Sequence, residues 1–552
     1  MLASTLWLAA CTTQSATDPV TTVAIPVTQT LPELLAAAER ATAAGNYPDA
    51  ARWYVQMARL SGDEQQLEEA ARACYDTQQL RAALQIAKRW LDINPTNQQA
   101  RELAALTALK LYEVDEAAAQ LQVLFESAYI TPAAGFIEWS NKIAGNDDHA
   151  ALAVMEKLAA AYPQLAEANY VVARLAEHTE NLGLMQESAQ RAHELAPYWS
   201  PAGLQLARAQ LLRGEQQLAL QTAQEVIKND GSLATRSDYA AFLLAAGKPN
   251  EAVRLWRELE QTEGDNSAAV RALAQIDFQV GNFQSAFNRF NTLLNSGKYL
   301  SESIFYLAGI AERTGGTAEA RQLYGRVQDG EFASAAQLRI AKLIQDSDGL
   351  AEALSFLESY GEASPDELLL SLQARTQMLS AAGDDAAALK IYNQALRDYP
   401  DVASLRLARA FLLVKMDKPV AALQAMYALH ELRPQDPTVL NALGYTLLDH
   451  SKQYQQGHDY IELALQHSPD SAAVMDSMGW ALFKLDQKEE ALVYLQKAAQ
   501  KMNDSEVDLH LGEVLWALNR RDEAVQVWQQ GLKRSPDNKA LQQRTKRAAK
   551  YN

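Results

Sequence analysis

Long apolar runs and an excess of positive charge are both missing from this 552-residue sequence. Beyond the first residues, no stretch approaches the roughly eighteen continuous apolar residues that a membrane-spanning helix needs. Lysine and arginine number 50 against 68 aspartates and glutamates, which gives a formal net charge of −18. Because an acidic chain repels polyanions, nucleic acid is not an expected partner.

Signatures of enzymatic chemistry are missing as well. The sequence has no G-x-x-x-x-G-K-[ST] phosphate loop, no H-E-x-x-H zinc motif and no G-x-S-x-G after a strand. Asp346 and Asp348 begin like a calcium loop, but the later ligands do not follow. His450, His458 and His467 lie close in sequence, and we interpret them as surface histidines rather than metal ligands, because a turn is expected between them. The sequence therefore predicts no catalytic residue, no metal and no cofactor, and not an enzyme.

What the sequence does contain is a repeat of about 34 residues, which is clearest near the C-terminus. Three segments can be aligned on one another: 440–470, 475–500 and 509–537. Each predicts two antiparallel helices, A and B, joined by a polar turn. Gly444, Gly479 and Gly512 on helix A are separated by 35 and 33 residues. They let helix A approach helix B, where Ala491 and Ala524 face them, and larger side chains would push the helices apart.

A small residue on helix B recurs along the whole chain at intervals of 33 to 36 residues. The predicted positions are Ala50, Ala83, Ala117, Ala151, Met185, Ala219, Ala252, Ala286, Ala320, Ala353, Ala388, Ala421, Gly457, Ala491 and Ala524. Turn glycines stand five residues before several of them, and aromatic residues stand four residues after several. We expect about fifteen helical pairs, with the fifth (Met185) and the thirteenth (Gly457) degenerate.

The predicted fold is therefore all-α, a tetratricopeptide-type α-solenoid superhelix. Its core should be quasi-one-dimensional, because each repeat buries its apolar face on its neighbours. We expect N-terminal repeats over 31–365, more regular C-terminal repeats over 366–536 and a basic capping helix over 537–552. A contact with anionic lipid or an acidic partner is the alternative for that basic tail. The region 125–148 is the least regular, and is either a deviant fourth repeat or a kink.

The first residues resemble a bacterial lipobox, in the sequence Leu8-Ala9-Ala10-Cys11. This predicts a lipoprotein signal segment over 1–11 with Cys11 lipidated, followed by a flexible tether over 12–30. A basic region before the apolar residues is missing, and the alternative is a short apolar helix with an incidental cysteine. With Cys11 lipidated, Cys74 has no partner for a disulfide within the chain.

A binding groove is expected on the concave side, which helix A lines in solenoids of this type. Counting from the helix-A glycines places Tyr445, Trp480, Phe483 and Trp516 on that side, with Asn441 and Asp476 among them. Exposed aromatic residues there would suit an amphipathic helix or an extended peptide. The alternative is that these aromatic residues pack between adjacent A helices.

Three segments carry a resemblance to a known family: 440–447 (LNALGYTL), 476–485 (DSMGWALFKL) and 510–524 (HLGEVLWALNRRDEA). They resemble the long tetratricopeptide outer-membrane lipoproteins of Gram-negative bacteria, which include the lipoprotein binding partner of a periplasmic carboxyl-terminal processing protease. The sequence departs from the family at Asp486 and Asn519, where a turn glycine is common, and by one inserted residue near 451–457. Over 31–440 the resemblance is generic.

The resemblance implies an adaptor on the periplasmic face of the outer membrane. Such an adaptor holds a serine protease of the C-terminal processing type and presents its substrates, including cell-wall hydrolases. The repeats themselves predict only a binding scaffold. A subunit of an envelope secretion, pilus or exopolysaccharide export machine is the alternative, and an enzyme with a tetratricopeptide arm would need a domain for which the repeats leave no room.

Overall fold

The computed structural model describes residues 29–548 apart from 128–129, 144–146, 263–265, 329 and 364. Over these residues the chain forms 31 α-helices and no strand. The odd-numbered helices up to α29 are the A helices: α1 (Leu31–Ala43), α3 (Glu64–Asp76), α5 (Gln98–Lys110), α7 (Pro132–Ile143), α9 (Ala166–His178), α11 (Ser200–Leu212), α13 (Leu233–Ala245), α15 (Ser267–Gln279), α17 (Leu300–Arg313), α19 (Ala333–Ser347), α21 (Pro365–Ala381), α23 (Ala403–Lys415), α25 (Pro437–Thr446), α27 (Ala472–Lys484) and α29 (Ser505–Ala517).

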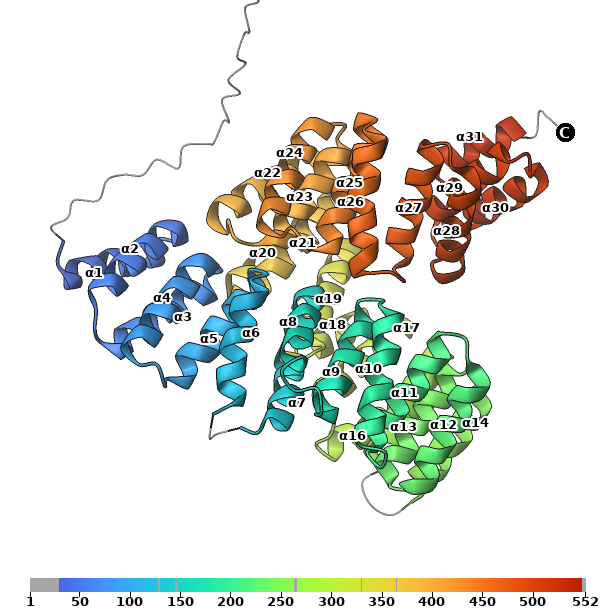
Figure 1. Cartoon of the computed structure of the whole chain (residues 1–552), viewed down its shortest axis with the longest axis horizontal. Helices are drawn as coiled ribbons and strands as arrows, with labels where there is room; N and C mark the ends of the chain where they lie inside the picture. The colour runs from blue at the N-terminus through green and yellow to red at the C-terminus, as the bar shows by residue number, and fades with distance from the viewer. Residues whose placement is uncertain are drawn as a thin grey trace, which may run out of the picture.

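Each A helix is followed by a B helix, and the fifteen pairs confirm the predicted all-α superhelix (Figure 1). The B helices are α2 (Tyr47–Leu60), α4 (Leu80–Ile93), α6 (Val114–Phe125), α8 (Asp148–Ala159), α10 (Leu182–Leu195), α12 (Gln216–Asn229), α14 (Pro249–Glu260), α16 (Phe283–Asn295), α18 (Thr317–Tyr324), α20 (Leu350–Ala363), α22 (Asp385–Asp398), α24 (Pro419–Leu432), α26 (Tyr454–His467), α28 (Lys488–Lys501) and α30 (Arg521–Arg534).

The turn between helix A and helix B contains a residue with left-handed backbone. Six of these turns use glycine: Gly45, Gly214, Gly247, Gly281, Gly315 and Gly383. Seven use another residue: Gln78, Tyr112, Glu180, Asp417, Lys452, Asp486 and Asn519. Asp486 and Asn519 therefore adopt the conformation that glycine supplies more easily, with φ of 67° and 63°.

The small helix-B residues are buried at fourteen of the fifteen predicted positions, and the prediction is wrong at Ala421. Ala421 is exposed, whereas Ala422 is fully buried and follows the left-handed Asp417 by five residues. Two adjacent alanines fit the 34-residue interval equally well, so spacing alone did not separate them. From Ala422 to Gly457 the interval is 35 residues, and the extra residue is absorbed by a π-helical turn over Leu447–Ser451.

The fourth repeat is a splayed pair. Helix α8 packs against α6 and α9, and α7 packs against α9, while α7 and α8 barely touch each other. Phe136 on α7 is fully buried, with its ring centroid 5.1 Å from that of Phe125 and 5.8 Å from that of Tyr162. These rings fill the space that a close α7–α8 contact would occupy, so the irregular sequence marks a deviant repeat.

The prediction of a quasi-one-dimensional core is wrong, because repeats far apart in sequence touch. In Figure 1 the first repeats, in blue, lie beside the orange repeats around residue 400. Gln79 Nε2 donates to the Asp398 carbonyl at 2.6 Å, and Leu182 N donates to Asp470 Oδ2 at 3.0 Å. Between these contacts, Arg433 reaches back to the third and fourth repeats. We call these contacts, made by 78–81, 110–112, 147 and 180–182 with 398–401, 433–436 and 470–472, the seam.

After the last repeat, α31 (Lys539–Ala548) packs on α30. Leu541 is fully buried, and a Cβ at Gly531 would lie 2.8 Å from its Cδ1. Among the described residues no helix is both long and apolar enough to cross a bilayer. Cys11, with the predicted signal segment and nearly all of the tether, lies outside the described residues.

Candidate functional site

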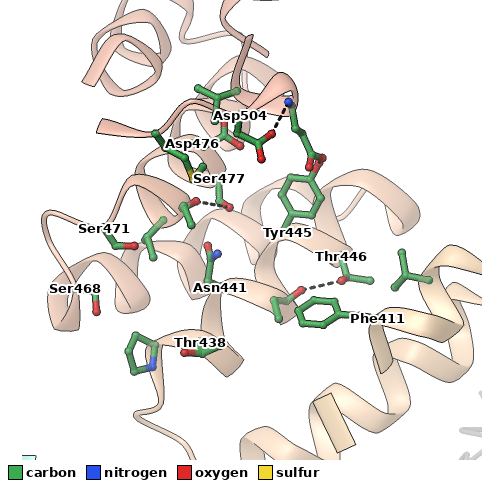
Figure 2. Close-up of a pocket in the computed structure, with 18 of the residues that line it drawn as sticks. Phe411, Thr438, Asn441, Tyr445, Thr446, Ser468, Ser471, Asp476, Ser477 and Asp504 are labelled. Carbon is green, nitrogen blue, oxygen red and sulfur yellow. Dashed lines mark hydrogen bonds between the residues drawn. The ribbon is translucent and has the colours of Figure 1, made fainter. Parts of the chain in front are cut away.

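A cavity of about 440 Å³ lies on successive A helices of the C-terminal repeats, α23, α25, α27 and α29 (Figure 2). One side is closed by His149 of α8, across the seam. The cavity lining contains three of the predicted groove residues, Asn441, Tyr445 and Asp476. The other lining residues are Phe411, Val414, Pro437, Thr438, Ala442, Thr446, Ser468, Ser471, Ala473, Val474, Ser477, Met502, Asp504, Glu506 and Val507.

Close packing of each A helix on its B helix fixes the positions of these side chains. A Cβ at Gly444 would lie 2.6 Å from Ile461 Cγ1, and one at Gly479 would lie 2.5 Å from Leu495 Cγ. A Cβ at Gly512 would lie 2.1 Å from Trp528 Nε1. Real contacts of this kind are essentially never so short, so glycine is required at all three positions, and the aligned glycines have the role that the sequence predicted.

Most polar groups of the cavity already have partners within the protein. Tyr445 Oη donates to Glu506 Oε1 at 2.6 Å, and Asp504 accepts from the Glu506 N–H at 2.6 Å as the N-cap of α29. Burial, and then the Glu506 carboxylate, raise the pKa of Tyr445, so its hydroxyl stays protonated. Ser477 Oγ donates to the Ala473 carbonyl at 3.0 Å.

Two buried polar atoms of the lining have no hydrogen-bond partner, Asn441 Oδ1 and Ser468 Oγ. Ser468 is only 2% exposed and caps the C-terminal end of α26. Because an unpaired buried acceptor costs free energy, such atoms are uncommon in folded proteins unless a water or ligand reaches them. Sequence reasoning selected Asn441 and missed Ser468, which lies in the B-to-A loop where the repeat pattern sets no requirement.

Beneath the cavity lies a buried ion pair that sequence reasoning also missed. His510 Nδ1 lies 3.0 Å from both carboxylate oxygens of Asp476, and the two residues are 34 positions apart, one repeat. The His510 ring stacks on Trp480, with centroids 4.1 Å apart and an interplanar angle of 18°. Burial alone would lower the pKa of His510, but the charge and the hydrogen bond of Asp476 reverse this, and the net shift is upward.

The four predicted groove aromatics do not form one continuous exposed strip. Trp480 is 9% exposed, its Nε1 donates to Asp449 Oδ1 at 3.3 Å, and Phe483 stacks on it. Trp516 packs on Trp528 with ring centroids 5.6 Å apart. Tyr445, Phe483 and Trp516 are half-buried. Trp480 is therefore part of the packing between repeats, and a role of the other three in binding stays a prediction.

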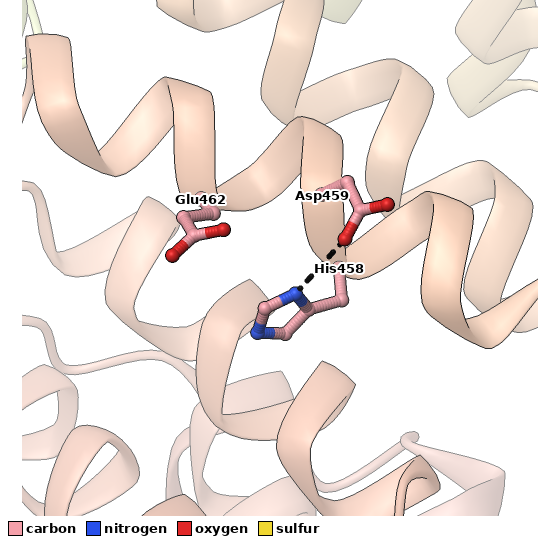
Figure 3. A group of neighbouring side chains, drawn as sticks. All are labelled: His458, Asp459 and Glu462. Carbon is pink, nitrogen blue, oxygen red and sulfur yellow. Dashed lines mark hydrogen bonds and ion pairs between the residues drawn. The ribbon is translucent and has the colours of Figure 1, made fainter.

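One group of side chains within the described part of the chain has the ligand spacing of a metal site: His458, Asp459 and Glu462 on α26 (Figure 3). His458 Nδ1 lies 3.4 Å from Asp459 Oδ1, and both carboxylates are exposed. His450 and His467 are not part of the group. An exposed cluster on one helix face is common without a metal, so it assigns no metal site.

No protein-family model matches the chain. A tetratricopeptide-repeat-containing protein of Pseudomonas aeruginosa is 30% identical over 209 residues, which is 38% of this chain and 35% of that protein. The chain thus matches only about a third of the length of this relative. Together with the fifteen hairpins and their 34-residue spacing, this makes the fold a tetratricopeptide-repeat superhelix, a class of protein-interaction scaffold.

Solved structures with similar helical repeats include the APC/C hetero-tetramer Cut9–Hcn1, at 16% identity, a TM-score of 0.34 and coverage of 93% of this chain and 96% of that one. The structure of Naa15/Naa10 bound to HypK gives 13% identity, a TM-score of 0.35 and coverage of 94% and 96%. A tetratricopeptide repeat protein from Parabacteroides merdae gives 13% identity, a TM-score of 0.35 and coverage of 45% and 98%. At these TM-scores no functional property is carried over.

Proposed function

We propose that this protein is a non-enzymatic scaffold that binds a protein partner on the concave side of its superhelix. The observation that carries the proposal is the cavity that four consecutive A helices build from Asn441, Tyr445, Asp476 and their neighbours. A solenoid that stacks its A helices side by side presents such a surface as a direct result of its fold. Interaction surfaces of this kind bind extended peptides or amphipathic helices.

The partner we propose is a periplasmic serine protease of the C-terminal processing type, together with the substrates that it cleaves. This rests on the resemblance carried by 440–447, 476–485 and 510–524, segments that include six of the eighteen cavity residues outside α8. A lipid anchor at Cys11 would place the scaffold on the periplasmic face of the outer membrane. The long tetratricopeptide architecture suits an export-machine subunit equally well, and that function is the alternative.

Capture of partners from detergent-solubilised envelopes, followed by mass spectrometry, separates the two functions. The protein should retain a C-terminal processing protease in stoichiometric amount. Recovery of secretion, pilus or polysaccharide-export components in its place would support the alternative and contradict the protease. The purified protein alone should leave casein and muropeptides uncleaved, and a turnover that persists through different purification routes would contradict the scaffold role.

A further inference from the structure

The unsatisfied atoms of the cavity indicate what kind of chain segment occupies it. Asn441 Oδ1 and Ser468 Oγ both line the cavity and lack partners (Figure 2). A carbonyl oxygen needs a donor, and a serine hydroxyl can both donate and accept. An extended polypeptide supplies backbone N–H and C=O groups along its length, so a segment lying across α25 and the α26–α27 loop could satisfy both atoms.

The side chains of the lining indicate the composition of that segment. Toward α23 the lining is apolar, with Phe411, which is 49% exposed, and Val414. Toward α29 it is acidic, with Asp504 and Glu506 on the loop and first turn. The described lining residues include neither lysine nor arginine. A carboxylate-rich pocket without a fixed cation favours a basic side chain of the ligand and disfavours an acidic one.

We propose that the cavity binds an extended segment of the partner that carries an apolar side chain and a lysine or arginine. The apolar side chain packs on Phe411 and Val414, and the basic group lies against Asp504 and Glu506. The backbone of the segment pairs with Asn441 and Ser468. This inference rests on the proposed scaffold function, since it names the chemistry that the same surface recognises.

The test uses an array of short peptides, acetylated and amidated so that their termini are uncharged, probed with the full-length purified protein. The array contains peptides with an apolar residue together with lysine or arginine, and matched peptides with glutamate in place of the basic residue. We expect the basic peptides to be retained and the acidic ones not. Asn441→Ala and Ser468→Ala should each reduce binding roughly tenfold, the size of a lost hydrogen bond in a buried site.

Two matched variants make the result specific. Ser303→Ala removes another fully buried serine hydroxyl without a partner, on α17 away from the cavity, and should leave peptide binding unchanged. The double variant Asp504→Asn, Glu506→Gln removes two charges but keeps an acceptor for the α29 N-cap and for Tyr445 Oη. It should erase the preference for basic over acidic peptides. Thermal unfolding of every variant checks that the fold is intact.

Each outcome decides one of the two proposals. Retention of acidic peptides, absence of any preference, or unchanged binding by Asn441→Ala and Ser468→Ala would overturn the inference about the ligand. If the protein retains no peptide but still captures a protease from envelopes, the ligand inference fails and the scaffold function stands. If it captures no protein partner, the scaffold function fails, whatever the array shows.

Discussion

Arg433 Nη1 lies 2.6 Å from Asp147 Oδ2, although 286 residues separate them in sequence. The same guanidinium donates through Nη2 to the Lys110 carbonyl at 2.7 Å and lies over the Tyr112 ring, 5.4 Å from its centroid. The Arg433 side chain is only 10% exposed. One arginine thus joins the thirteenth repeat to the third and fourth, and it is the central contact of the seam.

Replacing this arginine should open the superhelix. Arg433→Met keeps most of the side-chain volume but leaves Asp147 and the Lys110 carbonyl without their cation. Breaking a buried ion pair by removing one partner costs about 3–5 kcal/mol, and here that cost falls on the contact between distant repeats. We expect a larger radius of gyration in small-angle X-ray scattering with the helix content unchanged.

The control for the seam is an arginine that joins neighbouring repeats. Arg289 pairs with Glu260 at 2.8 Å and also with Asp277, and its side chain is 23% exposed. Arg289→Met should lower the thermal midpoint without changing the radius of gyration. Equal radii for the parent and Arg433→Met would show that the seam does not hold the superhelix closed.

Close packing inside each hairpin predicts a second effect. Ala491 is fully buried on α28, and its carbonyl would lie 3.1 Å from a Cβ at Gly479. Ala491→Leu should therefore overpack the α27–α28 pair and cost about 1–3 kcal/mol of unfolding free energy. Ala498→Leu, at another fully buried position of α28, should behave alike, while the exposed Gln487 should tolerate leucine. Identical urea midpoints for these variants and the parent would contradict the register.

Sequence reasoning succeeded where structure is local. The 34-residue hairpin is set by contacts within one repeat, so Gly479 and Ala491 revealed it. The seam was missed because the path of a superhelix sums small rotations over many repeats, and no single interval records that Arg433 meets Asp147. The pair of Asp476 and His510 left a readable signal, an acid and a base one repeat apart, but a spacing of 34 residues is shared by many pairs in such a chain.

The buried pair of Asp476 and His510 predicts a pH dependence of stability. The pKa of His510 is raised above its ordinary value of 6.5 in the folded state, despite burial, through the charge and hydrogen bond of Asp476. A raised folded-state pKa means that the pair stabilises fully below about pH 6.5 and that this contribution is lost as pH rises through the raised value. The advantage of the parent over Asp476→Asn in thermal midpoint should therefore shrink from mildly acidic to alkaline pH. A difference that grows with pH would contradict the assignment.

Anchoring through Cys11 gives a fourth prediction. If the lipobox is used, Cys11→Ser should move the protein from the outer-membrane fraction to the soluble periplasm. Cys74→Ala is the matched control, because Cys74 is buried, unpaired and, through that burial, has a thiol pKa raised to about 12. It should stay with the membrane. A Cys11→Ser protein that still sediments with the outer membrane would show that another feature holds it there.

Binding of the partner in the concave cavity is the central claim, and amide hydrogen exchange with and without the captured partner tests it most directly. The account predicts new protection on the A helices α25, α27 and the first turn of α29. The B helices α26 and α28, which expose Leu463 and Val493 on the other side of the same repeats, should keep their exchange rates. Protection confined to α26 and α28, with α25 and α27 unchanged, would contradict the claim.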